Sequence, residues 1–86
     1  MPRYLVESFV PRAAAVDLAQ TASRADVEAR RIACVRFLRA ILVPEDETCF
    51  LLYEAASPEL VAEASRRVSL SCDRIVEVFE ASTIPR

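Results

Sequence analysis

The stretch Arg3-Tyr-Leu-Val-Glu-Ser-Phe9 decides how this chain folds. We expect it to be a β-strand in the middle of a sheet, because large apolar side chains recur along it at alternate positions. Side chains alternate between the two faces of a strand, so one face takes Tyr4, Val6 and Ser8 and the other takes Leu5, Glu7 and Phe9. A carboxylate between two large apolar side chains makes the second face the more informative one.

The length and composition indicate one compact domain. The chain has 86 residues, of which 53% are hydrophobic, so residues 1–86 have enough apolar surface for one core and no second one. The formal net charge is −2, and the arginines are scattered among acids. A general nucleic-acid binder carries a basic patch and a high pI, so we expect no nucleic acid among the partners.

The start of the chain lacks the pattern of a signal peptide, since Met-Pro-Arg-Tyr is soon followed by Glu7. No apolar run approaches the length that spans a membrane. Cys34, Cys49 and Cys72 are widely spaced, which is typical of buried or half-buried free thiols in a cytosolic protein. We therefore expect a cytoplasmic protein with no membrane partner.

Two stretches carry helix signals. The Ala-rich stretch after Pro11 predicts a helix to about Arg31, which begins either at Asp17 as a cap or earlier, within residues 13–15. Ser57-Pro58-Glu59 is a strong start for a second, shorter helix, because Ser caps and Pro fits the first helical position. Apolar residues at steps of three and four give each helix a buried stripe: Leu18, Ala22, Ala25, Ala29 and Ile32 in the first, and Val61, Ala64 and Val68 in the second.

Three further stretches predict strands, at Val35–Val43, Cys49–Glu54 and Arg74–Glu80, and residues 82–86 form a tail. Pro44-Glu45-Asp46-Glu47 is then a hairpin turn. The resulting order β-α-β-β-α-β, with right-handed crossovers, builds a ferredoxin-like α+β fold. Its antiparallel sheet has the strand order 4-1-3-2, and both helices cover one face.

The helices need an apolar face beneath them, because a carboxylate buried there without a partner is costly. This rule assigns to the helix-covered face Tyr4, Val6, Leu38, Ala40, Cys49, Leu51, Tyr53, Val76 and Val78. The opposite face then receives Leu5, Glu7, Phe9, Phe37, Arg39, Ile41, Phe50, Leu52, Glu54, Ile75, Glu77 and Phe79. All four phenylalanines fall on this second face. A broad apolar patch marks an interface or a ligand groove, so we expect a homodimer through this face.

The acids on the second face allow two interpretations. Glu7 or Glu77 pairs with Arg39 or another arginine, or else Glu7, Glu54 and Glu77 form a cluster that binds a cation or moves a proton. Glu7 and Glu77 come from neighbouring strands, so directly opposed side chains would lie about 5 Å apart. Without histidine or glycine in the chain, neither a Ser-His-Asp set nor a glycine-rich phosphate loop can form.

Several stretches resemble a family of small bacterial domains of unknown function that has been described as nickel-binding. They are Met1-Pro-Arg-Tyr-Leu-Val-Glu7, Val35-Arg-Phe-Leu-Arg39, Leu52-Tyr-Glu-Ala55 with Ser57-Pro-Glu59, and Leu70-Ser-Cys-Asp-Arg-Ile-Val-Glu-Val78. The resemblance implies a ferredoxin-like fold and a divalent metal such as nickel. Where the family often has glycine, before the second and fourth strands, this chain has Cys34 and Ser69. Carboxylate ligands without histidine favour ions harder than nickel.

Three functions remain open at the level of sequence. The first is a ligand-binding dimer, with a small molecule or a divalent metal such as nickel between its sheets. The second is an enzyme of the dimeric α/β-barrel type, acting as a cyclase, isomerase or monooxygenase on a small hydrophobic molecule in an aromatic-lined cavity. The third is an interaction module whose open face binds another protein. The sequence does not decide whether the protein is an enzyme.

Overall fold

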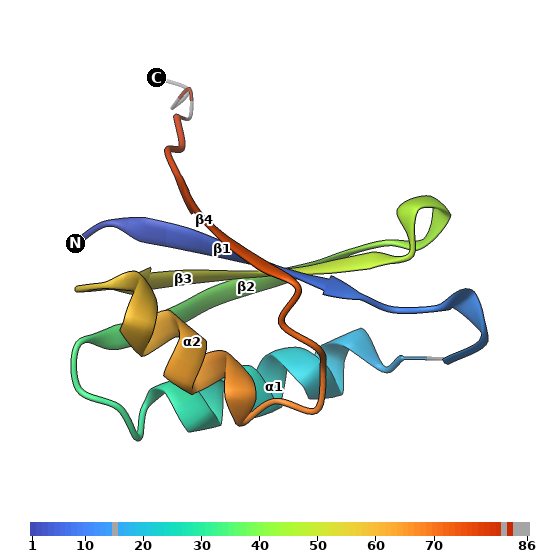
Figure 1. Cartoon of the computed structure of the whole chain (residues 1–86), viewed down its shortest axis with the longest axis horizontal. Helices are drawn as coiled ribbons and strands as arrows, with labels where there is room; N and C mark the ends of the chain where they lie inside the picture. The colour runs from blue at the N-terminus through green and yellow to red at the C-terminus, as the bar shows by residue number, and fades with distance from the viewer. Residues whose placement is uncertain (15, 82, 84–86) are drawn as a thin grey trace.

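The computed structural model describes residues 1–14, 16–81 and 83 (Figure 1). A four-stranded sheet lies on one side and two helices lie on the other, as the sequence predicts. The elements follow in the order β1 (Arg3–Phe9), η1 (Arg12–Ala14), α1 (Leu18–Ala29), β2 (Val35–Val43), η2 (Pro44–Asp46), β3 (Thr48–Ala55), α2 (Pro58–Arg66) and β4 (Arg74–Val78). The tail predicted for residues 82–86 lies outside the described residues, apart from Thr83.

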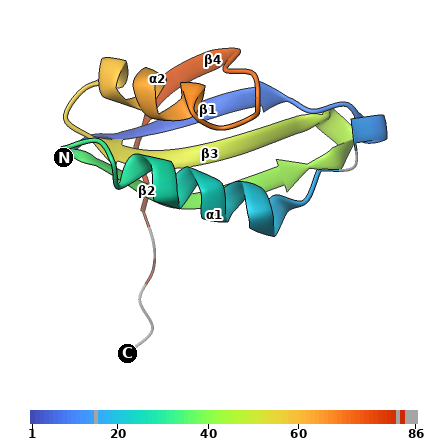
Figure 2. The same ribbon diagram turned by 90° about the horizontal axis from the view of Figure 1, so that it is seen from below.

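The sheet has the order β2-β3-β1-β4, which is the predicted order 4-1-3-2 read from the other edge. All neighbouring strands are antiparallel, and β1 lies between β3 and β4. Viewed from the helix side, α1 runs over β2 while α2 lies nearer β1 and β4 (Figure 2). The opposite face of the sheet carries no helix (Figure 1). The ferredoxin-like α+β fold is confirmed.

Each helix begins at a residue that the sequence singles out. The carboxylate of Asp17 accepts a hydrogen bond from the backbone N–H of Gln20 at 3.1 Å. The hydroxyl of Ser57 accepts from the backbone N–H of Leu60 at 3.4 Å, and Pro58 follows as the first helical residue. These caps satisfy backbone donors that the first turn of a helix leaves free. Neither described α-helix is long and apolar enough to cross a membrane.

The core lies between the sheet and the helices. Its centre consists of buried side chains from β1, β3 and α2 with the C-terminal half of α1: Tyr4, Val6, Ala29, Cys49, Leu51, Tyr53, Ala55, Val61 and Ala64. The predicted helix stripes are therefore buried at Ala25 and Ala29 in α1, at Val61 and Ala64 in α2, and at Val68, just beyond the end of α2. All three cysteines are free, but only Cys49 is buried, so the expectation of burial is wrong for Cys34 and Cys72.

A β-bulge in β2 changes which of its side chains face the helices. The pairing with β3 shifts between Phe37, opposite Tyr53, and Arg39, opposite Leu52. Phe37 therefore shares the helix-covered face with Tyr53, and their rings meet edge to face with centroids 5.4 Å apart. The prediction that Phe37 lies on the uncovered face is wrong. An extra residue in one strand moves the side chains before it to the other face, and Leu38 is the residue that the pairing skips.

The register of β4 corrects a second set of assignments. Ile75 lies opposite Val6, and Glu77 opposite Tyr4, so both belong to the helix-covered side of this edge strand. Val76 and Val78 take the uncovered side instead. Glu77 is exposed because β4 is an edge strand. The strand also ends at Val78, two residues earlier than predicted.

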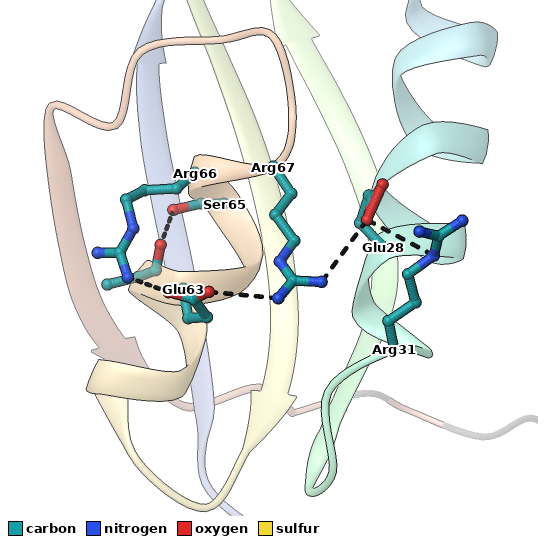
Figure 3. A network of polar contacts seen from close by, with 7 residues as sticks. Glu28, Arg31, Glu63, Ser65, Arg66 and Arg67 are labelled. Carbon is teal, nitrogen blue, oxygen red and sulfur yellow. Dashed lines mark hydrogen bonds and ion pairs between the residues drawn. The ribbon is translucent and has the colours of Figure 1, made fainter.

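The two helices are joined at the surface by ion pairs around Arg67, which caps the end of α2 (Figure 3). Its guanidinium lies 3.3 Å from the carboxylate of Glu63 in α2 and 4.0 Å from that of Glu28 in α1. Arg66, followed by Arg67, lowers the pKa of Glu63 through hydrogen bonds and charge. Exposed pairs of this kind stabilise a protein by less than about 1 kcal/mol each, so the helices are held chiefly by burial against the sheet.

Candidate functional site: the open face of the sheet

The face of the sheet without helices, called here the open face, is made by alternate residues of all four strands. Four rows follow from the strand register, each crossing from β2 through β3 and β1 to β4. The rows are Arg36, Glu54, Arg3 and Val78; Arg39, Leu52, Leu5 and Val76; Ile41, Phe50, Glu7 and Arg74; and Val43, Thr48 and Phe9, which has no β4 partner. Charged side chains occupy the first row apart from Val78, the β2 end of the second row (Arg39) and the β1–β4 end of the third row (Glu7 and Arg74). The other positions are apolar, apart from Thr48.

Some of the apolar side chains on the open face are strongly exposed. Phe9 is 57% exposed and Ile41 is 46% exposed, although both lie in strands. Leu52, by contrast, is buried, with only 5% of its surface exposed. Of the apolar residues predicted for this face, Phe9 and Ile41 are exposed and Phe50 is half-buried, whereas Phe37 lies on the other face.

The first row is an ion-pair cluster around Arg3. Its guanidinium lies 3.5 Å from the carboxylate of Glu54 and 2.5 Å from that of Glu80, which follows β4. The second carboxylate oxygen of Glu80 lies 4.0 Å from the guanidinium of Arg39 in β2. Glu80 raises the pKa of Arg3, chiefly through their hydrogen bond. These ion pairs link β1, β3 and β2 at one end of the open face.

Glu7, the acid that the sequence singles out, does lie on the open face. Its strand partner on β4 is Arg74, and the two side chains are 3.8 Å apart. The expected approach of Glu7 and Glu77 is wrong, since the register places these two acids on opposite faces. An arginine beside Glu7 corresponds to the first of the two interpretations, an ion pair, although the partner is Arg74 and not Arg39.

The three acids proposed as metal ligands are not brought together. Glu54 lies opposite Arg3, Glu7 lies opposite Arg74, and Glu77 faces the other way. Within residues 1–14, 16–81 and 83, no three Cys, Asp or Glu side chains gather closely enough to hold a metal ion. Imidazole is a preferred ligand of nickel in proteins, and the chain has no histidine. The donor groups that the structure describes in one chain therefore do not fit a nickel site.

The sequence pattern missed Arg3, Arg74 and Glu80 as parts of this face. Arg3 begins the decisive strand, and its alternation with Leu5 and Glu7 was the signal that could have found it. Arg74 takes its place only through the register of β4. Glu80 lies beyond the end of that strand, where no periodicity applies.

Comparison with known proteins gives a family and a fold. Residues 4–78 match the family model described as "Nickel responsive protein SCO4226-like". The crystal structure of SCO4226 from Streptomyces coelicolor A3(2) is similar, with a TM-score of 0.72 and 24% sequence identity over 93% of this chain and 99% of that one. No curated protein sequence matches this chain significantly. The likeness to the crystal structure supports the ferredoxin-like fold.

Proposed function

We propose that this chain, which belongs to the SCO4226-like family, is a small cytoplasmic ligand-binding protein that pairs with a second copy through its open face. The observation that carries the proposal is a whole sheet face with large apolar side chains and no helix over it. Contiguous apolar surface of this kind marks an interaction or ligand site. Free thiols at all three cysteines agree with a reducing compartment.

A second copy suits the charges of the open face. Arginines and acids both occur on it, with Arg36 and Arg39 on β2 and the Glu7–Arg74 pair towards β4. A twofold contact places one surface patch against itself, so a face with both signs of charge can be complementary to its own copy. The apolar middle would then be buried between two sheets, and the charged groups would lie around it.

The open face suits two kinds of ligand, a divalent cation and a small apolar molecule. The family description, "nickel responsive", supports a divalent cation, whereas the acids of one chain do not converge. We propose that such a cation is shared between two copies, with Glu7 or Glu54 as the acids on the open face that could contribute to it. A small apolar molecule between the sheets is the other ligand that this face suits.

Two variants test dimerisation. Each replaces one exposed apolar residue, on the open face of the sheet in the first variant and on a helix in the second. Ile41→Glu places a charge on the open face, and Val27→Glu places one on α1, where the valine is 48% exposed and the open face is far away. We expect sedimentation velocity to give a dimer for the wild type and Val27→Glu, and a monomer for Ile41→Glu. A wild type that stays monomeric at high concentration would contradict the proposal.

Ligand binding is tested separately on the untagged protein. Native mass spectrometry shows whether the purified dimer retains a small molecule, and calorimetric titration with Ni²⁺ measures binding per dimer. If the metal is shared, binding disappears in the monomeric Ile41→Glu variant and in Glu7→Gln with Glu54→Gln. Nickel binding of equal strength by the Ile41→Glu monomer would contradict a shared site.

A further inference from the structure

A hollow of about 470 Å³ lies at the end of the molecule that carries the β2–β3 hairpin (Figure 1, right). Three parts of the chain form its walls: the residues that follow β1, a residue shortly before α1, and the end of β2 with the first residue of η2. The lining residues are Val10, Pro11, Arg12, Val16, Leu42 and Pro44. Val10 and Leu42 belong to the layer between the sheet and the helices, so the hollow opens beside that layer and not on the open face.

Hydrogen bonds to Glu47, at the end of the hairpin turn, hold the segment after β1 in place. The backbone N–H of Val10 donates to the carbonyl of Glu47 at 2.7 Å, and the N–H of Arg12 donates to its carboxylate at 2.9 Å. The N–H of Ala14 donates to the carbonyl of Pro11 at 2.9 Å, which closes the short turn η1. These bonds fix one wall, so the hollow is formed before any ligand binds, as in most small-molecule sites.

The hollow is apolar apart from Arg12. Val10 is buried, and Val16 and Leu42 pack against the core, so these side chains form a fixed apolar wall. The Nε of Arg12 donates to the carbonyl of Pro44 at 3.2 Å, which holds the guanidinium at the rim. No acid of the described residues forms an ion pair with Arg12, so its two terminal nitrogens remain able to donate. A mostly apolar hollow of about 300–1,000 Å³ with a few fixed polar groups is typical of a small-molecule site.

We infer that this hollow binds a small monocarboxylate with an apolar body, such as a medium-chain fatty acid, with its carboxylate on Arg12. The two terminal nitrogens of a guanidinium can donate side by side to the two oxygens of a carboxylate. The apolar body lies on Val10, Val16 and Leu42, away from water. One arginine balances one negative charge, whereas the three acids at residues 45–47 repel a ligand that carries more. The inference goes beyond the proposed function and does not depend on the pairing of two copies.

Arg24 provides a matched control from a second hollow. This hollow, of about 610 Å³, lies between α1 and the chain that follows α2, and charges of both signs line it: Asp17, Arg24 and Glu28. The Nε of Arg24 donates to the carbonyl of Arg67 at 3.4 Å, and no acid within residues 1–14, 16–81 and 83 forms an ion pair with it. Arg24 therefore resembles Arg12 in its contacts, whereas the two acids of its hollow disfavour a carboxylate.

Calorimetric titration with octanoate, and with octan-1-ol as its uncharged match, tests the role of Arg12. We expect one octanoate per chain in the wild type. Arg12→Gln should weaken octanoate binding by at least about tenfold and leave octan-1-ol binding unchanged, because only the carboxylate loses its partner. Arg12→Lys should retain part of the octanoate affinity, and Arg24→Gln should retain all of it. Arg12 is exposed, so the fold should survive the change, and circular dichroism checks this.

Two results of these titrations would contradict the inference. Equal octanoate binding by the wild type and Arg12→Gln would show that Arg12 does not receive the carboxylate. Loss of both octanoate and octan-1-ol in Arg12→Gln would show that Arg12 shapes the hollow without recognising the charge.

Methyl resonances in NMR spectra of the wild type show where octanoate lies. We expect saturable shifts at Val10, Val16 and Leu42, and none at Ile41 on the open face. Shifts at Ile41 in their place would support an apolar ligand on the open face, as the proposed function has it, and would overturn the inference. Absence of any saturable shift would overturn the inference alone, since the pairing of two copies is tested separately by Ile41→Glu.

Discussion

Cys34, directly before β2, has a backbone conformation that favours glycine. Its φ is 66°, in the left-handed region, and its carbonyl accepts a hydrogen bond from the N–H of Ala56 at 3.2 Å. A side chain with a Cβ atom is strained in this region, whereas glycine adopts it freely. The resemblance to a family with glycine before the second strand pointed to the same position.

Cys34→Gly should therefore stabilise the protein. We expect the free energy of unfolding to rise by about 0.5–1 kcal/mol, because relief of backbone strain outweighs the greater freedom of glycine in the unfolded chain. Urea denaturation measures the change. Cys72→Gly is the control, since Cys72 is also exposed but has no positive φ, and it should destabilise. An unchanged midpoint for Cys34→Gly would show that the strain is negligible.

The buried hydroxyl of Tyr53 has no hydrogen-bond partner among the described residues. Burial raises the pKa of Tyr53 far above its ordinary value of 10.0, and it also raises the pKa of the Cys49 thiol above 9.0. An acidic group whose pKa is raised by folding holds its proton more tightly in the folded state. Its contribution to stability is complete below the unfolded pKa and is lost as the pH rises towards the folded pKa.

We expect the free energy of unfolding to decrease above about pH 9, where Cys49 begins to ionise in the unfolded chain, and more steeply above about pH 10, where Tyr53 does. Tyr53→Phe should remove the second decrease and stabilise the protein at pH 7 by about 1 kcal/mol, because an unpaired buried hydroxyl is lost. Denaturation at pH 7–11 tests both effects. A destabilising Tyr53→Phe would show that the hydroxyl has a partner, such as a bound water.

At the scale of elements, the segment before β4 determines which way this strand faces. The buried Ser8 of β1 donates its hydroxyl to the carbonyl of Ser71, and the backbone N–H of Asp73 donates to the carbonyl of Glu7 at 2.9 Å. The carboxylate of Asp73 accepts from the N–H of Phe9 at 2.6 Å. These bonds join residues 71–73 to the end of β1 and thereby set the register in which Arg74 meets Glu7.

Ser8→Ala should lower the free energy of unfolding by about 1 kcal/mol, because the carbonyl of Ser71 loses its donor at a partly buried site. Ser69→Ala, two residues before Ser71 and exposed, is the control and should change stability by less than about 0.5 kcal/mol. Hydrogen exchange of the β4 amides should be faster in Ser8→Ala than in the control. Equal exchange in both variants would mean that the strand pairing alone sets the register.

At the scale of the whole molecule, both helices cover one face of the sheet, and the segment Phe79–Ala81 leaves the sheet on the other. Side chains of this chain fill the layer between the sheet and the helices, whereas the open face carries exposed Phe9 and Ile41. Two acids of the open face form ion pairs with arginines: Glu54 with Arg3, and Glu7 with Arg74. Both features support the proposal that two copies pair through this face.

The sequence by itself determined the elements and their order. The first helix begins after Asp17, one of its two predicted starts, the second begins after Ser57 at Pro58 as predicted, and β2 spans Val35–Val43 as expected. These features depend on local chemistry: a capping side chain meets donors three residues away, and alternation is a property of a few consecutive residues. Four strands and two helices in this order leave few topologies, so the sheet order also follows from sequence.

Only the tertiary structure decided which face several side chains take. A strand pairing that shifts by one residue reverses the face of every side chain beyond the shift, and this shift depends on the neighbouring strand. The bulge in β2 thus moved Phe37 into the core, and the register of β4 separated Glu77 from Glu7 and gave Glu7 the partner Arg74. Glu80 reaches Arg3 across 77 positions of sequence, a contact that no local pattern contains because only the folded sheet brings the two residues together.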